Sequence, residues 1–477
     1  MDGPISAADV WLGAGDGTAK GDNEWKTYIV FGEGKGVRNK NNEAAPLWSL
    51  SELCDSARPE DFSSTYTSNQ YKYYCGPYLW SSSPSCDTGF SATYTPAYSH
   101  YCGYYALDVT HTGSIPGYGW RINSDPVMGG IDFAHGSYLG EPWSRMAIGR
   151  VLIGGKETWA GFIGGGYGQS GDAGKGFFVI DLKDGHILWS YTRTNYSIPA
   201  SPAIVDTDND GFVDTAYVGN LGGDMWRFTF CTQARGLSCA TGNWSGGLLF
   251  QSSETRPIFT TAAVARDSSS NLWIFWGTGD KINPNSSAPG KFFAIKDSGN
   301  GTYYESDLPD ISVHTDTSRG WSIPLGSGGE KMLSDPTVFG GVLLFTTYTP
   351  YAGSNPCIQT GTSLLYALAM QKMSIGGKAY NPGAGFLTDS DGSTTRSVSL
   401  GLGIASTPII SQRSGGGAPD IFVSVSGGIK EDGTTITTQP AQIKSKADLN
   451  AASPLIQRLS QTAPYTQLLQ WKDGRIQ

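Results

Sequence analysis

A cluster of acidic residues in one short segment has the spacing to bind a metal ion. Four aspartates occupy positions 1, 3, 5 and 9 of a single loop: Asp206, Asp208, Asp210 and Asp214. Gly211 stands at position 6, and the backbone carbonyl of Phe212 is available at position 7. This is the oxygen spacing of a calcium loop of the EF-hand type, in which the glycine permits a sharp turn.

The loop departs from the EF-hand pattern at position 12, where Tyr217 replaces the bidentate glutamate. We therefore expect Asp214 to act as the bidentate ligand. Hard oxygen ligands in a flexible loop favour Ca²⁺ over Mg²⁺, which requires a tighter octahedral site. The alternative is an Asx-rich turn without metal. We predict one Ca²⁺ in the loop 206–214, bound by Asp206, Asp208, Asp210, the Phe212 carbonyl and Asp214.

The elements that position this loop are predicted to be strands. Residues 203–205 before the aspartates and 215–218 after them are β-forming, so the loop would close a β-hairpin. The chain has 477 residues, 65 of them glycine, with 12% aromatic and only 16% charged residues. This composition is typical of short strands joined by tight turns. Extended helical periodicity is hard to find before residue 440, so we predict an all-β protein.

A repeated strand order indicates the architecture. Six repeats begin near residues 3, 141, 201, 260, 335 and 407. Each has a short apolar strand followed by a second strand, typically ending in glycine, and the first five also have a third strand rich in aromatic or aliphatic residues. One antiparallel sheet per repeat, arranged radially, is a β-propeller. A pair of β-sandwiches would not produce six repeats of the same order. We predict one propeller domain over residues 1–477, with six to seven blades.

The first repeat contains a long insertion at residues 38–103, rich in Ser, Tyr and Asn. It holds four of the seven cysteines: Cys54, Cys75, Cys86 and Cys102. Four cysteines in one segment allow three pairings, and we expect two disulfides within the insertion. Its role is either that of a cross-linked loop or that of a binding surface.

The other cysteines complete a pattern of exported proteins. Cys231 and Cys239 bracket a short loop that suits a local disulfide, and no cysteine lies in a CxxC pair. Disulfides persist outside the cytoplasm, so we expect export. Cys357 remains, either with a partner outside this sequence or as an unpaired thiol.

Charge and hydropathy exclude two classes of partner. The net charge is −9, with no clustered Lys/Arg stripe, so nucleic acid binding is not expected. No apolar run approaches the roughly 20 residues that span a bilayer. The start MDGPISAADV has neither a basic region nor an apolar core, so no signal peptide is visible. The sequence is therefore expected to be part of a longer precursor.

Around the aspartate loop, SPAIVDTDNDGFVDTAYVGNLGGDMWRFTF resembles the C-terminal propeller of the type IV pilus-tip adhesin and assembly-factor family (PilY type, related to neisserial PilC). DGPISAADVWL, PIFTTAAV, WIFWGTGD and GWSIPLGSGGEKMLSDPTVFGG resemble other blades of that family. A strand unit resembling DGMLHAF, usual in the family, is absent here. Some members carry an RGD tripeptide proposed for integrin binding. This chain has only Lys20-Gly21-Asp22, which we interpret as a solvated turn.

The resemblance implies a modified, quinoprotein-like propeller and a function. It implies a calcium-binding protein at the cell surface that caps the pilus above minor pilins. The protein would support pilus assembly, control retraction and twitching motility, and contribute to adhesion to host or abiotic surfaces. The resemblance also implies that calcium, bound at Asp206, Asp208, Asp210 and Asp214, switches these behaviours, and that the protein is not an enzyme.

Two other functions fit parts of the sequence. VIDLKDGHILW at residues 179–189 resembles the repeat of pyrroloquinoline-quinone dehydrogenases, which share a similar propeller. The simpler interpretation is that Gly185 makes a turn and Trp189 docks between blades. The adjacent cysteines that cover the quinone in those enzymes are missing. The third possibility is a generic extracellular binding propeller whose calcium is purely structural, and ligand spacing cannot separate this from a switch.

Overall fold

The structure is a computed structural model of the chain. It describes residues 3–13, 20–32, 103–111, 116–122, 138–168, 171–231, 239–299, 301–314, 317–353, 360–375, 377–388, 391, 393–411, 420–426, 428–429, 435–436 and 456–458. The chain divides into two compact units. Unit 1 comprises residues 1–218 and 228–246, and unit 2 comprises residues 219–227 and 247–477.

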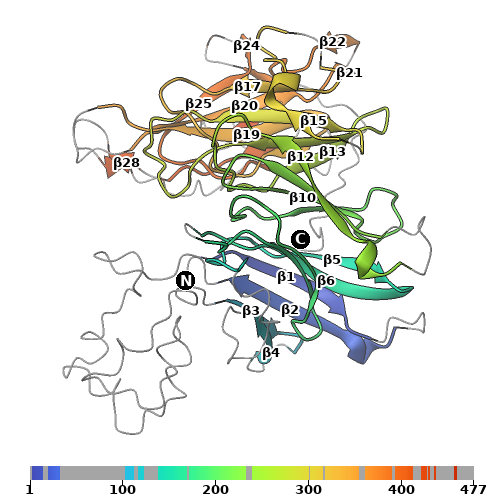
Figure 1. The fold of residues 1–477 in the computed structure, drawn as a ribbon. Helices are drawn as coiled ribbons and strands as arrows, with labels where there is room; N and C mark the ends of the chain where they lie inside the picture. The colour runs from blue at the N-terminus through green and yellow to red at the C-terminus, as the bar shows by residue number, and fades with distance from the viewer. Residues whose placement is uncertain are drawn as a thin grey trace, which may run out of the picture. The chain divides into compact units, whose positions relative to one another are not determined.

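Unit 1 contains two four-stranded antiparallel sheets, each with its strands in chain order, drawn from blue to green in Figure 1. The first comprises β1 (Ile5–Trp11), β2 (Trp25–Gly32), β3 (Tyr104–Asp108) and β4 (Gly117–Ile122). The second comprises β5 (Ala147–Ile153), β6 (Lys156–Gly164), β7 (Phe177–Asp181) and β8 (Ile187–Tyr191).

The division between the units falls within the third sheet, whose strand order is β16-β12-β11-β10-β9. Its strands are β9 (Ala203–Val205), β10 (Thr215–Gly219), β11 (Met225–Thr229), β12 (Ser245–Gln251) and β16 (Tyr303–Tyr304). The first four correspond to the third repeat. The short strand β16 pairs in parallel with β12, an addition that the repeat pattern does not predict.

Unit 2 continues the same plan. One sheet comprises β13 (Ala263–Arg266), β14 (Leu272–Gly277), β15 (Lys291–Asp297) and β17 (Gly320–Pro324). The next comprises β18 (Thr337–Phe339), β19 (Val342–Thr349), β20 (Thr362–Ala369) and β25 (Ser397–Leu402). The last comprises β26 (Ile409–Ser411), β27 (Asp420–Phe422) and β30 (Ile456–Arg458).

Short elements decorate these sheets. Three two-stranded hairpins are β21 (Met373–Ile375) with β22 (Lys378–Tyr380), β23 (Leu387–Thr388) with β24 (Thr394–Thr395), and β28 (Gly428–Ile429) with β29 (Thr435–Ile436). The helical elements of the described residues are 3-10 turns: η1 (Asp22–Glu24), η8 (Thr241–Asn243) and η9 (Glu305–Asp307). Within the described ranges, no helix has the length and apolar character to cross a membrane.

The predicted all-β class is confirmed, and each of the six repeats corresponds to one sheet. The closure of six to seven blades into one domain over 1–477 stays a prediction. The insertion lies outside the described residues except for Gly103. The same holds for Cys54, Cys75, Cys86, Cys102 and Cys357, so their pairings also stay predictions.

Strand burial explains why these sheets form. All five residues of β10 and all six of β14 are buried, so both faces of these strands are covered by protein. β-branched and aromatic residues fill such pleated, buried surfaces well. The hairpins β5–β6 and β18–β19 each turn on a Gly-Gly pair whose φ angles are positive at both residues, as two-residue type I′ turns require.

Tryptophans on outer strands join neighbouring sheets in the same way in both units. In unit 1, Trp120 Nε1 of β4 donates a hydrogen bond to the carbonyl of Leu182, directly after β7, at 2.7 Å. In unit 2, Trp321 Nε1 of β17 donates to the carbonyl of Met370, directly after β20, at 3.1 Å. Both indoles are buried, so each bond satisfies a donor that has lost access to water.

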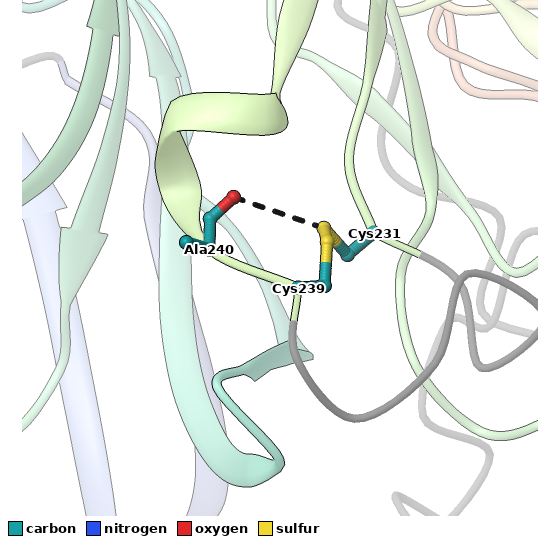
Figure 2. The surroundings of a disulfide bond; sticks show 3 residues. All are labelled: Cys231, Cys239 and Ala240. Carbon is teal, nitrogen blue, oxygen red and sulfur yellow. Dashed lines mark hydrogen bonds between the residues drawn. A yellow bond between two sulfur atoms is a disulfide. The ribbon is translucent and has the colours of Figure 1, made fainter.

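Cys231 and Cys239 form a disulfide in unit 1, with Cα atoms 5.9 Å apart, inside the usual range of 4.4–6.8 Å (Figure 2). The Cys231 sulfur also lies 3.9 Å from the carbonyl oxygen of Ala240. This is the predicted pair. Its oxidation in the exported protein stays a prediction that mass mapping can check.

A half-buried ion cluster in unit 2 holds η9 to strand β15. Glu305 accepts hydrogen bonds from Lys291 Nζ at 2.8 Å and from Arg256 Nη1 at 3.1 Å, and the Ser253 hydroxyl also donates to it. Burial opposes ionisation, but the hydrogen bonds from Lys291 and Ser253 and the Lys291 charge outweigh it. Together they lower the pKa of Glu305 from its usual 4.5 to about 2.

We predict that Glu305→Gln destabilises unit 2 by about 3 kcal/mol at pH 7, because the variant loses a carboxylate whose pKa is depressed on folding. A carboxylate whose pKa is lowered on folding stabilises the folded state fully above its unfolded pKa of 4.5. This stabilisation is lost as the pH falls towards 2, the pKa in the folded state. The gap between wild type and variant in urea unfolding should therefore shrink between pH 4.5 and pH 2.

Glu254→Gln is the matched control, because this side chain is 69% exposed although it contacts Arg256 at 2.8 Å. An exposed pair contributes about 0–1 kcal/mol. Equal losses in the two variants, or a Glu305→Gln gap that stays constant down to pH 2, would contradict the prediction.

Candidate metal centre

The aspartate loop closes the hairpin between β9 and β10. Val205 ends β9 directly before Asp206, and Thr215 begins β10 directly after Asp214. Val205 pairs with Thr215 in antiparallel register, and the Asp214 N–H donates to the Val205 carbonyl at 3.0 Å. The ends of the loop are therefore fixed by a ladder of buried residues, as the sequence predicts.

The structure brings three of the predicted ligands together. One carboxylate oxygen from each of Asp206, Asp208 and Asp210 lies within 4.8 Å of the others. Ca²⁺ binds oxygens at about 2.3–2.6 Å, so two ligands on opposite sides of one ion are about 5 Å apart. The three carboxylates therefore have the spacing to share a single calcium ion.

Backbone N–H groups hold these carboxylates in place. Asp206 accepts hydrogen bonds from the N–H of Gly211 at 2.7 Å and of Asp210 at 3.2 Å. Asp210 in turn accepts from the N–H of Phe212 at 2.8 Å. Gly211 has φ +90° and Asn209 has φ +62°, both in the left-handed region that a tight turn of this kind uses.

Asp214 has a different environment from the other three. Its side chain is buried, and one oxygen accepts hydrogen bonds from the Thr207 N–H at 2.7 Å and the Thr207 hydroxyl at 2.6 Å. The other oxygen accepts from the Thr215 hydroxyl at 2.8 Å. Asp214 thus ties the start of the loop to its end. The predicted bidentate role of Asp214, and the role of the Phe212 carbonyl, stay predictions.

Electrostatics in the loop favour a bound cation. Desolvation within the loop, followed by the charges of the neighbouring aspartates, raises the pKa of Asp208 from 3.8 to about 6, although the residue is exposed. Burial also raises the pKa of Asp214, against the hydrogen bonds from Thr207 and Thr215. In both groups the raised pKa means that the ionised carboxylate is less stable than a free one, and a bound cation would offset this cost.

Sequence reasoning missed two residues at the site. Thr207 holds Asp214, and its position between two aspartates is a signal for side-chain hydrogen bonding to the turn. Arg150 comes from β5, and its guanidinium lies 5.3 Å from the centre of the Phe212 ring. The Arg150 carbonyl accepts the N–H of Val213 at 2.7 Å. No sequence pattern relates a residue 56 positions earlier to this loop.

Lys20 of the Lys20-Gly21-Asp22 tripeptide is engaged within unit 1. Its Nζ contacts both carboxylate oxygens of Glu157, at 2.7 and 2.8 Å, and lies 4.6 Å from the Trp11 ring centre. Gly21 and Asp22 are exposed. This arrangement fits the interpretation as a surface turn, with the lysine charge compensated by Glu157.

The residues that suggested a quinone enzyme have structural partners. Gly185 has φ +80°, and its N–H donates to the Asp181 carbonyl at 2.9 Å, so it forms the predicted turn. The Trp189 ring centre lies about 6 Å from those of Phe228 in β11 and Trp244 directly before β12. These contacts account for both residues through packing.

Comparisons with known proteins place the loop inside a matched region. Residues 100–283 match the family model of the PilY1 beta-propeller domain. A "Type IV pilus biogenesis factor PilY1 homolog" of Xylella fastidiosa is 24% identical over 348 residues, which cover 62% of this chain and 23% of that protein. "Type IV pilus biogenesis factor PilY1" of Pseudomonas aeruginosa is 33% identical over 130 residues, which cover 26% of this chain and 10% of that protein.

A solved structure gives the same result for the fold. The crystal structure of the Pseudomonas aeruginosa PilY1 C-terminal domain matches with a TM-score of 0.53 and 16% identity, covering 91% of this chain and 83% of that domain. At this identity the likeness shows the fold alone, and the predicted propeller class is confirmed. The chain spans less than a quarter of the length of the two curated relatives.

We predict that Gly211→Ala weakens calcium binding by about fivefold or more, because a Cβ at φ +90° strains the turn by about 1 kcal/mol or more and shifts the Asp206 contacts. The matched control is Gly299→Ala in unit 2, which has φ +80° and open space around its Cβ position. Both variants should lose stability in thermal unfolding, and Gly211→Ala must in addition displace Arg150 Nη2, which lies 2.7 Å from its Cβ position. Calorimetry should find weaker calcium binding in Gly211→Ala alone, and equal binding in both variants would contradict the prediction.

Proposed function

The chain belongs to the PilY1-type family, and from this premise we propose that it is the calcium-binding propeller of a type IV pilus biogenesis factor. The protein is exported to the cell surface and acts at the pilus tip, in contact with minor pilins. There it supports assembly, controls retraction and contributes to adhesion to host or abiotic surfaces. We propose no enzymatic activity for it.

The observation that carries the calcium proposal is the convergence of Asp206, Asp208 and Asp210 within 4.8 Å in a loop with fixed ends. These carboxylates would hold the ion, with Asp214 and the Phe212 carbonyl as the further ligands predicted from spacing. A bound Ca²⁺ supplies positive charge where the carboxylates repel one another. The loop lies inside residues 100–283, the region that matches the PilY1 propeller model.

The chain's own residues explain how calcium binding would alter the loop. Without the ion, repulsion among the carboxylates favours opening of the turn, while the hydrogen bonds of Asp214 to Thr207 and Thr215 oppose it. The strands on both sides are buried, so the change stays local. Such a local order–disorder equilibrium is the kind of element that ligands shift in regulated proteins.

A second candidate is a binding propeller with purely structural calcium. It is favoured by the three hydrogen bonds of Asp214, which hold the loop closed within a single sheet. The two proposals agree on calcium binding and differ in whether pilus function responds to it.

We predict that Asp214→Ala abolishes calcium binding while global folding survives. The change removes a charge and leaves three donors of Thr207 and Thr215 without their acceptor, which costs about 1–3 kcal/mol within the loop. Asp208→Ala should weaken binding less, because this residue is exposed and accepts one long hydrogen bond of 3.3 Å. Asp184→Ala, in the exposed turn before β8, is the matched control.

Calorimetry on the purified chain measures calcium binding, and unchanged uptake by Asp214→Ala would exclude this site. In the full-length protein, the same substitution should alter pilus-dependent motility without reducing export. Lost calcium binding with unaltered motility would favour structural calcium over the switch.

A further inference from the structure

Arg150 contacts the aspartate loop through both its backbone and its side chain. Its carbonyl accepts the Val213 N–H at 2.7 Å, and its guanidinium lies 5.3 Å from the Phe212 ring centre. Nη2 is 2.7 Å from the position that a Cβ on Gly211 would occupy. The positive charge therefore lies directly against the turn that presents the aspartates.

Neighbouring carboxylates compensate this charge weakly. Arg150 Nη1 is 3.5 Å from Glu157 Oε1, a distance at the limit of a hydrogen bond. Glu157 makes closer contacts with Lys20, at 2.7 and 2.8 Å. Because Glu157 is shared in this way, it compensates the Arg150 charge only in part.

The charge is near enough to act on the carboxylates. The Gly211 nitrogen lies 2.7 Å from Asp206 Oδ2. Two bonds of about 1.5 Å each would join this nitrogen through Cα to a Cβ, whose position is 2.7 Å from Arg150 Nη2. The guanidinium is therefore within about 10 Å of the Asp206 carboxylate, close to one Debye length at physiological salt. Side-chain exposure of Arg150 is 33%, so solvent screens it only in part.

We propose that Arg150 is an internal counter-cation of the aspartate loop: it lowers the affinity of the loop for calcium and holds the loop together when calcium is absent. This inference rests on the proposed calcium binding. A guanidinium stays protonated over the whole physiological pH range, so its charge is always present. It attracts the aspartates in the metal-free loop and repels a divalent ion bound among them.

The charge of Arg150 is proposed to weaken calcium binding and to stabilise the metal-free loop. These two effects can be measured separately. Arg150→Met keeps an apolar stem against Phe212 and removes the charge, whereas Arg150→Lys keeps the charge. Lys175→Met is the matched control, because it also removes one positive charge but lies far from the loop. Arg150 pairs with Trp159 of β6, and Lys175 lies near Gly164 at the end of the same strand, about 17 Å further along it. For Arg150→Met we expect calcium to bind about three- to tenfold more tightly.

The readouts are the calcium Kd by calorimetry and the midpoint of thermal unfolding in EDTA. In Arg150→Met the Kd should fall and the unfolding midpoint in EDTA should also fall, by a few degrees. Arg150→Lys and Lys175→Met should keep the wild-type Kd within twofold.

Three results would overturn the proposal. A calcium Kd of Arg150→Met that is equal to or higher than that of the wild type would show that the Arg150 charge does not oppose calcium binding. An unfolding midpoint in EDTA that does not fall would show that it does not support the metal-free loop. If wild type binds no calcium, the proposed function fails together with this inference, whereas normal wild-type binding with either of the first two results overturns this inference alone.

Discussion

Burial of both faces of the central strands is the constraint on which the rest of the structure depends. Every residue of β10 and β14 is buried, so the two sheets that contain these strands need protein on both sides. The tryptophan bonds from Trp120 to Leu182 and from Trp321 to Met370 satisfy polar groups where neighbouring sheets meet. A loop that starts and ends on such strands has fixed ends, and its carboxylates cannot separate by moving the strands apart.

Charge is placed where this packing can hold it. Asp214 is buried at the base of the loop, and its carboxylate oxygens accept hydrogen bonds from Thr207 and Thr215. Asp208 at the tip is exposed. The base therefore stays ordered by hydrogen bonds, and the tip carries the repulsion. Glu305 in unit 2 is stabilised in a similar way, because Lys291 and Ser253 donate hydrogen bonds to its carboxylate in place of solvent.

Local signals in the sequence predict much of the fold and part of the site. The strands follow from β-forming residues and glycine turns, and the Asp206, Asp208 and Asp210 cluster follows from spacing, because its members lie within one turn. Arg150 could not be found, since it reaches the loop only through the packing of β5. Strand β16 could not be predicted for the same reason, because its parallel pairing with β12 joins residues some 50 positions apart.

Contacts that leave the loop determine what calcium binding can affect. In the described part of unit 1 these include the Val213 N–H to the Arg150 carbonyl and the Phe230 N–H to the Asp214 carbonyl, each at 2.7 Å. The second lies at the ordered base and changes little when the tip opens. The first joins Val213, directly before the base residue Asp214, to β5, where Arg150 contacts Glu157 and Glu157 contacts Lys20. Arg150 on β5 therefore contacts the loop through both its backbone and its side chain, so a change of the loop on calcium binding would act on this residue directly.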